Sequence, residues 1–300
     1  MDFDWNDDQR AILAAVDALC AQHAGPARAI ELDAKAGWDE PLDAALAEAG
    51  FTEVALGAPE TGTLEAALLV AEVARLAGTL PIGAQALVAP ALLGRVVPGP
   101  VRFGAHARTV LVDCGDEARL VSLAPGDGTP VRSNFMQPVG TLALDARSGE
   151  SLGEGSGEAL RSWWRVALAT ELYGTMQAAL EITVAYVKRR RQFGRAIGSF
   201  QALQHRLAMC TVLVEGTRWL AFEAASKDDP GESAAVAAAY AAEAANQLFR
   251  ETHQLTGAMG FTREHDLHVF SMRLQALRLE VGGASSHRRA IAAQRWISRP

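Results

Sequence analysis

Residues 187–208 read VKRRRQFGRAIGSFQALQHRLA, and this stretch joins a basic run to an apolar, helix-like pattern. Five arginines lie close to Phe193, although the whole chain carries a formal net charge of −7. Basic residues at a helix end are ordinarily solvated and favourably placed beside the negative end of the helix dipole. Arginine can also grip a pyrophosphate with paired hydrogen bonds, and an aromatic neighbour can support a planar ring. The stretch therefore predicts either a solvated helix end or a local anion site.

The overall composition excludes several classes of protein. The net charge of −7 and a pI near 5.6 argue against nucleic acid as a partner. Cys20, Cys114 and Cys210 lie far apart, so neither a disulfide scaffold nor a zinc site is predicted. His265 and His268 have no further Cys or His spaced to complete a metal site. The acidic start is unlike a signal peptide and charges interrupt the apolar stretches, so we expect a cytoplasmic protein with no metal and no membrane contact.

Helical and strand patterns segregate along the chain. Helical periodicity runs from about 6 to 93, short β-branched runs occupy 101–150, and helical periodicity returns afterwards. This order argues against a doubly wound fold and predicts a mainly α fold with a small β domain, formed by one small sheet of about four to six short strands. The predicted domains are an N-terminal helical domain at 1–97, a reduced β domain at 98–157 and a C-terminal helical bundle at 158–300.

The longer elements can be placed individually from their periodicity. Three candidate strands lie at 108–113, 118–123 and 141–145. The predicted C-terminal helices cover 160–189, 200–226, 233–255, 265–279 and 284–297. The helix at 233–255 is very rich in alanine, which favours helix formation and close helix packing.

Two C-terminal motifs carry a resemblance to a known family. Residues 186–208, YVKRRRQFGRAIGSFQALQHRLA, resemble the acyl-CoA dehydrogenase signature, in which Tyr, Arg and a Phe-Gly step precede Phe-Gln and an apolar helix. Residues 253–273, HQLTGAMGFTREHDLHVFSMR, resemble its second signature, a Gln followed by a glycine-rich turn and a helix. Residues 1–16 look like the usual family opening. The resemblance covers the C-terminal half well, the N-terminal helices loosely and the strands poorly, and it implies the acyl-CoA dehydrogenase-like fold.

The first motif implies contacts to FAD. In the family, the arginine two positions before the Gln-Phe-Gly step binds the FAD pyrophosphate, and here that residue is Arg190. Phe193 would pack on the cofactor, with Gln192 adding a polar contact. Gln201 matches a further residue on the cofactor side. These family residues reach across a subunit interface to FAD held mainly by a neighbouring subunit.

The second motif implies a contact to the other half of the same cofactor. Gln254 and Gly257 match the turn that receives the adenosine diphosphate half of FAD, and Ala258 stands where a second glycine is common. Glycine lets the backbone approach a phosphate closely. The ordinary alternatives are that Gln254 caps a helix and that Gly257 is a C-cap.

The catalytic carboxylate of the family has no counterpart at either of its usual positions. Gly282 stands where most members place the glutamate base, and Trp164 stands where other members place it on the long helix. Glu280 is two residues from the first position, a rotation of roughly 200° on a helix, and Glu171 is two turns from the second. The catalytic residues are therefore left unassigned, with Glu171 and Glu280 as candidate displaced bases.

The resemblance then implies three alternative functions. The first is a subunit of an FAD-dependent acyl-CoA dehydrogenase that contributes FAD contacts, while a longer homologous subunit supplies the glutamate base. This resembles the heteromeric branch that handles bulky substrates such as steroid side-chain CoA thioesters, with electrons passing to an electron-transfer flavoprotein. The second is a self-contained acyl-CoA dehydrogenase, in a homo-oligomer, that uses Glu171 or Glu280. The third is a non-catalytic structural partner that binds no flavin.

Overall fold

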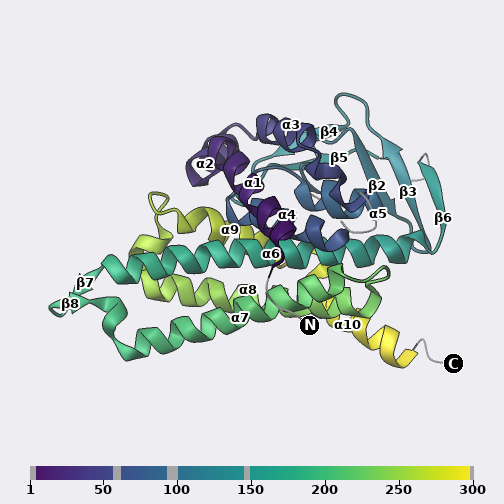
Figure 1. The fold of residues 1–300 in the computed structure, drawn as a ribbon. Coiled ribbons are helices and arrows are strands. Elements are labelled where there is room, and N and C mark those ends of the chain that lie inside the picture. Colours follow the sequence, from purple (N-terminus) through teal and green to yellow (C-terminus); the bar gives the residue numbers. More distant parts are fainter. Residues whose placement is uncertain (1–4, 57–61, 93–100, 145–148, 298–300) are drawn as a thin grey trace.

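The computed structural model describes residues 5–56, 62–92, 101–144 and 149–297. The N-terminal helices pack on one side of a long helical bundle, and most of the strands gather beside the start of α6 (Figure 1). The fold is mainly α with a small β portion, which confirms the predicted fold class. None of the helices in these ranges has both the length and the apolar character needed to cross a lipid bilayer.

Side-chain capping joins two of the N-terminal helices. These elements are α1 (Asp7–His23), α2 (Pro26–Ala34), α3 (Glu40–Glu48), the 3₁₀ segment η1 (Phe51–Leu56), α4 (Thr63–Arg75), the π-helical segment η2 (Ala84–Val88) and α5 (Ala89–Ala91). The Asn6 side chain accepts a hydrogen bond from the Gln9 amide at 2.8 Å, which satisfies a backbone donor at the start of α1. The Gln9 side chain donates to Glu65, in the first turn of α4, at 3.0 Å. The capped starts of α1 and α4 are thereby held together.

The strands between residues 101 and 154 form two small antiparallel sheets in the described part of the chain. One has the order β1 (Val101–Arg102), β5 (Val139–Leu142), β4 (Gly128–Val131), and the other β2 (Thr109–Asp113), β3 (Glu117–Ser122), β6 (Glu150–Glu154). The expectation of one small sheet is therefore wrong, although the number of strands fits. Alternating residues predict that a segment is extended, but they do not specify its partner. Here β3 pairs with β6, the strand that directly precedes α6, instead of joining the sheet of β5.

The C-terminal helices form the body of the molecule. They are α6 (Ser156–Arg189), α7 (Gln201–Ala225), α8 (Gly231–Thr256), η5 (Gly257–Phe261), α9 (Leu267–Leu277), η6 (Glu280–Gly282), α10 (Gly283–Ala292) and η7 (Ala293–Ile297). A short hairpin of β7 (Arg191–Gln192) and β8 (Arg195–Ala196), followed by η4 (Ile197–Ser199), links α6 to α7. The helices follow the predicted order. The predicted domain boundary at 97–98 lies outside the described residues, and the one at 157–158 falls in the first turn of α6.

Arg273 of α9 ties the bundle to the other parts of the fold. Its side chain is only 1% exposed and donates to the carbonyl oxygens of Gly78 at 2.9 Å and Met136 at 3.1 Å. It also donates to the Thr79 hydroxyl at 2.7 Å. Buried polar groups are costly unless they are hydrogen-bonded, so these three bonds fix α9 against the end of α4 and the loop before β5.

The packing of α6 on α4 depends on Gly174. A Cβ atom added there would collide with the Ala71 carbonyl oxygen and lie 3.1 Å from the Ala74 Cβ. We therefore expect Gly174→Ala to force the helices apart and to lower the free energy of unfolding by about 1–3 kcal/mol. Urea denaturation monitored by circular dichroism measures this loss. Gly62→Ala is the matched control, because an added Cβ has no neighbour within 4 Å at that position; equal losses in the two variants would contradict the expectation.

Candidate functional site

The hairpin after α6 presents the first group of predicted residues. Arg190 is the C-cap of α6, and its backbone leaves the helix in an extended conformation. Phe193 and Gly194 both have positive φ, 53° and 78°, as a tight two-residue hairpin turn requires. This turn directs the Phe193 ring outward, where 88% of the residue surface is exposed. Arg190, Gln192 and Gln201 are exposed as well.

Aromatic contacts hold this hairpin against the start of α7. The rings of Phe193 and Phe200 meet edge to face with centroids 6.0 Å apart, and the Arg195 guanidinium lies 3.9 Å from the Phe200 centroid. The Arg195 guanidinium is therefore engaged in a cation–π contact with the Phe200 ring. Arg190 forms none of the ion pairs found among the described residues. The hairpin therefore presents a guanidinium and a phenyl ring to the outside.

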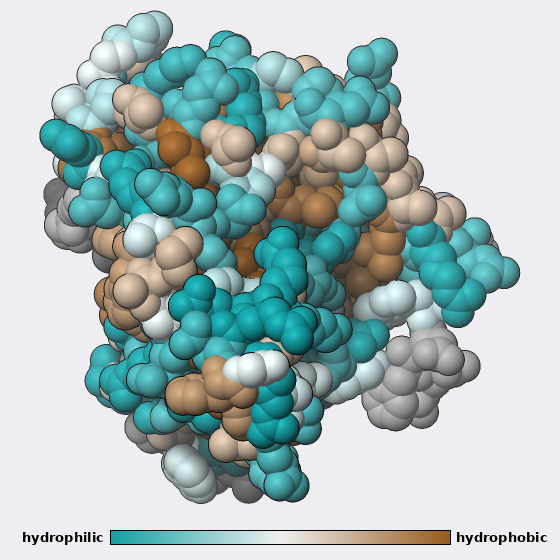
Figure 2. Space-filling view, turned by 90° about the vertical axis from the view of Figure 1, so that its left-hand side faces the viewer, coloured by the Kyte–Doolittle hydropathy of each residue, from teal (hydrophilic) through white to brown (hydrophobic). Residues whose placement is uncertain are grey.

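The second group of predicted residues lies at the C-terminal end of α8. Gly257 is the C-cap of that helix with φ +60°, and Gln254 is exposed in the last helical turn. The rings of Tyr186 in α6 and His265 meet at 5.6 Å, so the segment after η5 packs on the final turns of α6. Both groups therefore lie toward the same end of the bundle (Figure 1). That end faces the viewer in Figure 2, where hydrophilic surface surrounds separate hydrophobic patches.

The two candidate bases form one buried cluster that sequence reasoning did not find. Arg102, in β1, donates to Glu171 of α6 at 2.7 Å and to both carboxylate oxygens of Glu280, the longer bond being 3.4 Å. The side chains of Arg102, Glu171 and Glu280 are 11%, 6% and 21% exposed. The two carboxylates thus share one guanidinium, to which we refer as the Arg102 cluster.

Burial and ion pairing act together on the charged groups of the Arg102 cluster. Burial opposes the charge of Arg102, but Glu171 and Glu280 keep its pKa above the ordinary value. Burial raises the pKa of Glu280, and Arg102 partly offsets that rise. The cavity that Glu171 lines, beside Gly78 and Arg273, has a volume of about 10 Å³. This is room for about one water molecule, far less than a substrate needs.

The usual base positions of the family lie beside the same cluster. The Arg102 guanidinium is 6.0 Å from the Trp164 ring centroid, and Trp164 donates a hydrogen bond to Glu280. Gly282 adopts a left-handed conformation at the start of α10, two residues after Glu280. Arg102 of β1 thus lies next to Trp164 and Glu280, near the two positions at which the family resemblance leads one to expect the base.

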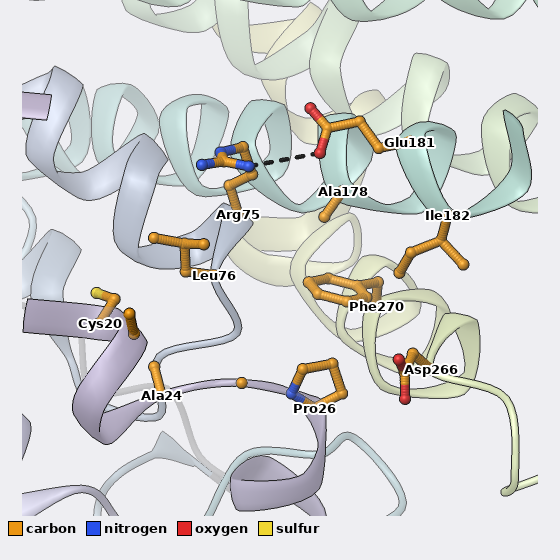
Figure 3. Close-up of a pocket in the computed structure, with 12 residues that line it drawn as sticks. Cys20, Ala24, Pro26, Arg75, Leu76, Ala178, Glu181, Ile182, Asp266 and Phe270 are labelled. Atoms are coloured by element: carbon orange, nitrogen blue, oxygen red, sulfur yellow. Dashed lines mark hydrogen bonds and ion pairs between the residues drawn. The ribbon is translucent and has the colours of Figure 1, made fainter. Parts of the chain in front are cut away.

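A separate cavity of about 310 Å³ opens between the turn that joins α1 to α2, the end of α4, and helices α6 and α9 (Figure 3). Leu76, Ile182 and Phe270 form apolar walls, and Arg75 pairs with Glu181 at 3.4 Å on one side. Burial, followed by nearby carboxylates, raises the pKa of the Cys20 thiol to about 12, so it stays protonated at neutral pH. None of the predicted cofactor-binding residues lines this cavity.

A buried histidine in α10 predicts acid sensitivity. Burial, followed by repulsion from Arg165, lowers the pKa of His287 to about 4. The unfolded chain takes up this proton near pH 6.5 and the folded chain does not, so stability falls as the pH drops from about 6.5 to 4. The loss attributable to this group is at most about 3 kcal/mol.

His287→Phe should flatten this part of the pH dependence. The measurement is the free energy of urea unfolding at several pH values between neutral and 4.5. His205→Phe, at an exposed position of α7, is the control. An unchanged slope in His287→Phe would contradict the assignment.

Comparisons with known proteins agree with this architecture. Residues 156–296 match the family model described as acyl-CoA dehydrogenase, C-terminal domain. The acyl-CoA dehydrogenase IpdE2 of Mycobacterium tuberculosis is 32% identical over 89% of this chain and 91% of its own length. The ChsE4-ChsE5 complex of Mycobacterium tuberculosis contains a chain that superposes with a TM-score of 0.84 at 22% identity, covering all of both chains. A chain of the Tcur3481-Tcur3483 steroid ACAD G363A variant gives a TM-score of 0.83 at 24% identity, covering 95% of this chain and 97% of that one. The likeness to the two solved structures shows the fold.

Proposed function

Since this chain belongs to the acyl-CoA dehydrogenase family of oxidoreductases that act on CH–CH bonds, we propose that it is the FAD-contacting subunit of a heteromeric acyl-CoA dehydrogenase. A longer homologous subunit supplies the glutamate base and most of the flavin site. The observation that carries this proposal is a contrast within the chain: Arg190 and Phe193 are exposed, whereas Glu171 is buried and Glu280 is partly buried, both paired with Arg102.

The exposed end of the bundle has the chemistry that an FAD pyrophosphate requires. Arg189, Arg190 and Arg191 are consecutive and exposed, in a chain whose net charge is −7. Guanidinium groups bind phosphates through charge-assisted, paired hydrogen bonds. The residues present therefore fit the cofactor that the family uses, with Arg190 and Phe193 at the dinucleotide, Gln192 and Gln201 near them, and Gln254 and Gly257 at its adenosine diphosphate half.

The bound flavin supplies the acceptor for the hydride removed from the β-carbon of an acyl-CoA thioester. The complementary step is removal of the α-proton by a carboxylate within hydrogen-bond reach. Glu171 and Glu280 do not suit that step, because each is ion-paired with Arg102 and Glu171 faces a cavity of about 10 Å³. This chain therefore positions the cofactor, and its partner takes the proton.

The structural neighbours suggest a two-chain assembly and a substrate class for this proposal. One neighbour is a chain of the ChsE4-ChsE5 complex, and another is a chain of a steroid ACAD. We propose by analogy that the present chain works on a bulky acyl-CoA, of the steroid side-chain type, and that electrons leave through an electron-transfer flavoprotein. Three separated free cysteines favour a cytoplasmic location.

Expression with and without homologous longer chains from neighbouring genes tests the proposal. We expect the pure chain to show no dehydrogenation and the complex to be yellow and active. Glu171→Gln and Glu280→Gln in this chain should leave the turnover of the complex unchanged if it stays assembled. Turnover by the pure chain that either substitution abolishes would instead identify a self-contained enzyme. A colourless complex would identify a structural partner.

A further inference from the structure

An exposed aromatic ring ends the same turn that Gly257 begins. Phe261 is the last residue of η5, and 68% of its surface is exposed. On its inner side Phe261 stacks on His253, with centroids 4.2 Å apart and an interplanar angle of 26°. His253 in turn meets the Phe249 ring at 4.4 Å and 63°. The outermost ring is thus supported from below and open above.

The middle ring of this stack is neutral. His253 is 5% exposed, and neither of its ring nitrogens has a hydrogen-bond partner within the described part of the chain. Burial, followed by repulsion from His268, lowers its pKa, so the imidazole is uncharged at neutral pH. A neutral imidazole can stack on an aromatic ring without adding charge, so His253 covers the inner face of Phe261 while most of that residue stays exposed.

We propose that Phe261 is the platform on which the adenine ring of the dinucleotide stacks. This inference rests on the proposed function. Base–aromatic stacking needs an exposed aromatic face, and Phe261 presents one on the side away from the His253 stack. Gly257, with φ +60° and open space beside it, lets a ligand approach the backbone of the same turn. The C-cap Arg190 of α6 lies at the same end of the bundle, because the segment after this turn packs on the last turns of α6. Arg190 can therefore bind the phosphates, and Phe261 the adenine, of a single dinucleotide.

The test uses the heteromeric complex stripped of FAD and titrated calorimetrically with two probes. ADP carries the base and two phosphates, whereas inorganic pyrophosphate carries the charge alone. Phe261→Ala should weaken ADP binding about 10-fold and leave pyrophosphate binding unchanged. Phe261→Tyr should restore ADP binding. Met259→Ala, at an exposed residue of the same turn, is the matched control and should change neither.

The outcomes separate this inference from the proposed function. Unchanged ADP affinity in Phe261→Ala, with weaker ADP binding in Arg190→Ala, would overturn the platform and leave the FAD-contacting role in place. A complex that binds no ADP, or one in which neither variant matters, would remove both. Dissociation of the Phe261→Ala complex on gel filtration would show that Phe261 is a subunit contact, and would also overturn the platform.

Discussion

Replacing Arg190 with alanine should remove most of the flavin from the complex with the longer subunit. The guanidinium is exposed at the end of α6, next to the outward Phe193 ring, where it can reach a ligand that another subunit encloses. Hydrogen bonds to charged groups contribute about 1.5–3 kcal/mol each, so losing this group should weaken FAD binding about 10- to 100-fold. The ratio of flavin absorbance to protein after gel filtration measures the loss.

Two further variants make the Arg190 experiment specific. Lys188→Ala removes an exposed positive charge two residues earlier and should retain the flavin if position, rather than net charge, matters. Arg190→Lys keeps the charge but not the planar fork, so it should give an intermediate flavin content. Full flavin content in Arg190→Ala would rule out the role assigned to this residue.

Replacing Arg102 with methionine should destabilise the fold by about 3–5 kcal/mol. The substitution leaves the Glu171 and Glu280 carboxylates buried without their shared cation, and breaking a buried pair costs more than the pair itself contributes. Methionine keeps much of the side-chain length, so the loss reports chiefly on charge. The midpoint and slope of urea unfolding, monitored by circular dichroism, measure it.

The control for Arg102 is an exposed ion pair. Arg10→Met breaks the contact with Asp7 on the surface of α1, where both side chains are more than half exposed, and should cost less than about 1 kcal/mol. Combining Arg102→Met with Glu171→Gln and Glu280→Gln should recover much of the stability. Similar losses in Arg102→Met and Arg10→Met would show that the cluster is not the buried network described above.

The helices could be predicted from the sequence because their information is local. The predicted helix at 160–189 is observed as Ser156–Arg189, and the one at 200–226 as Gln201–Ala225. The structure places Arg190 at the end of α6 and Gly257 at the end of α8, which is the ordinary C-cap alternative for Gly257. That they touch FAD remains a prediction.

The Arg102 cluster could not be predicted because its members are distant in sequence. Arg102 lies 69 residues from Glu171 and 178 from Glu280, and no spacing rule joins a strand residue to two helical segments. The sequence therefore offered the two carboxylates as alternative bases rather than as partners. Arg102 lies outside the three candidate strands, so no local pattern marks it, and its partners depend on how β1 lies against α6 and η6.

The placement of Arg273 has a consequence for how the protein is made. Its bonds to the Gly78 carbonyl and the Thr79 hydroxyl span 195 and 194 residues. These two acceptors, which follow α4, therefore gain this donor only once α9 has been made. During synthesis on the ribosome, nearly the whole polypeptide has to emerge before those contacts can form. Products truncated ahead of α9 would expose unpaired backbone groups next to apolar surface, which makes them natural clients for chaperones and proteases.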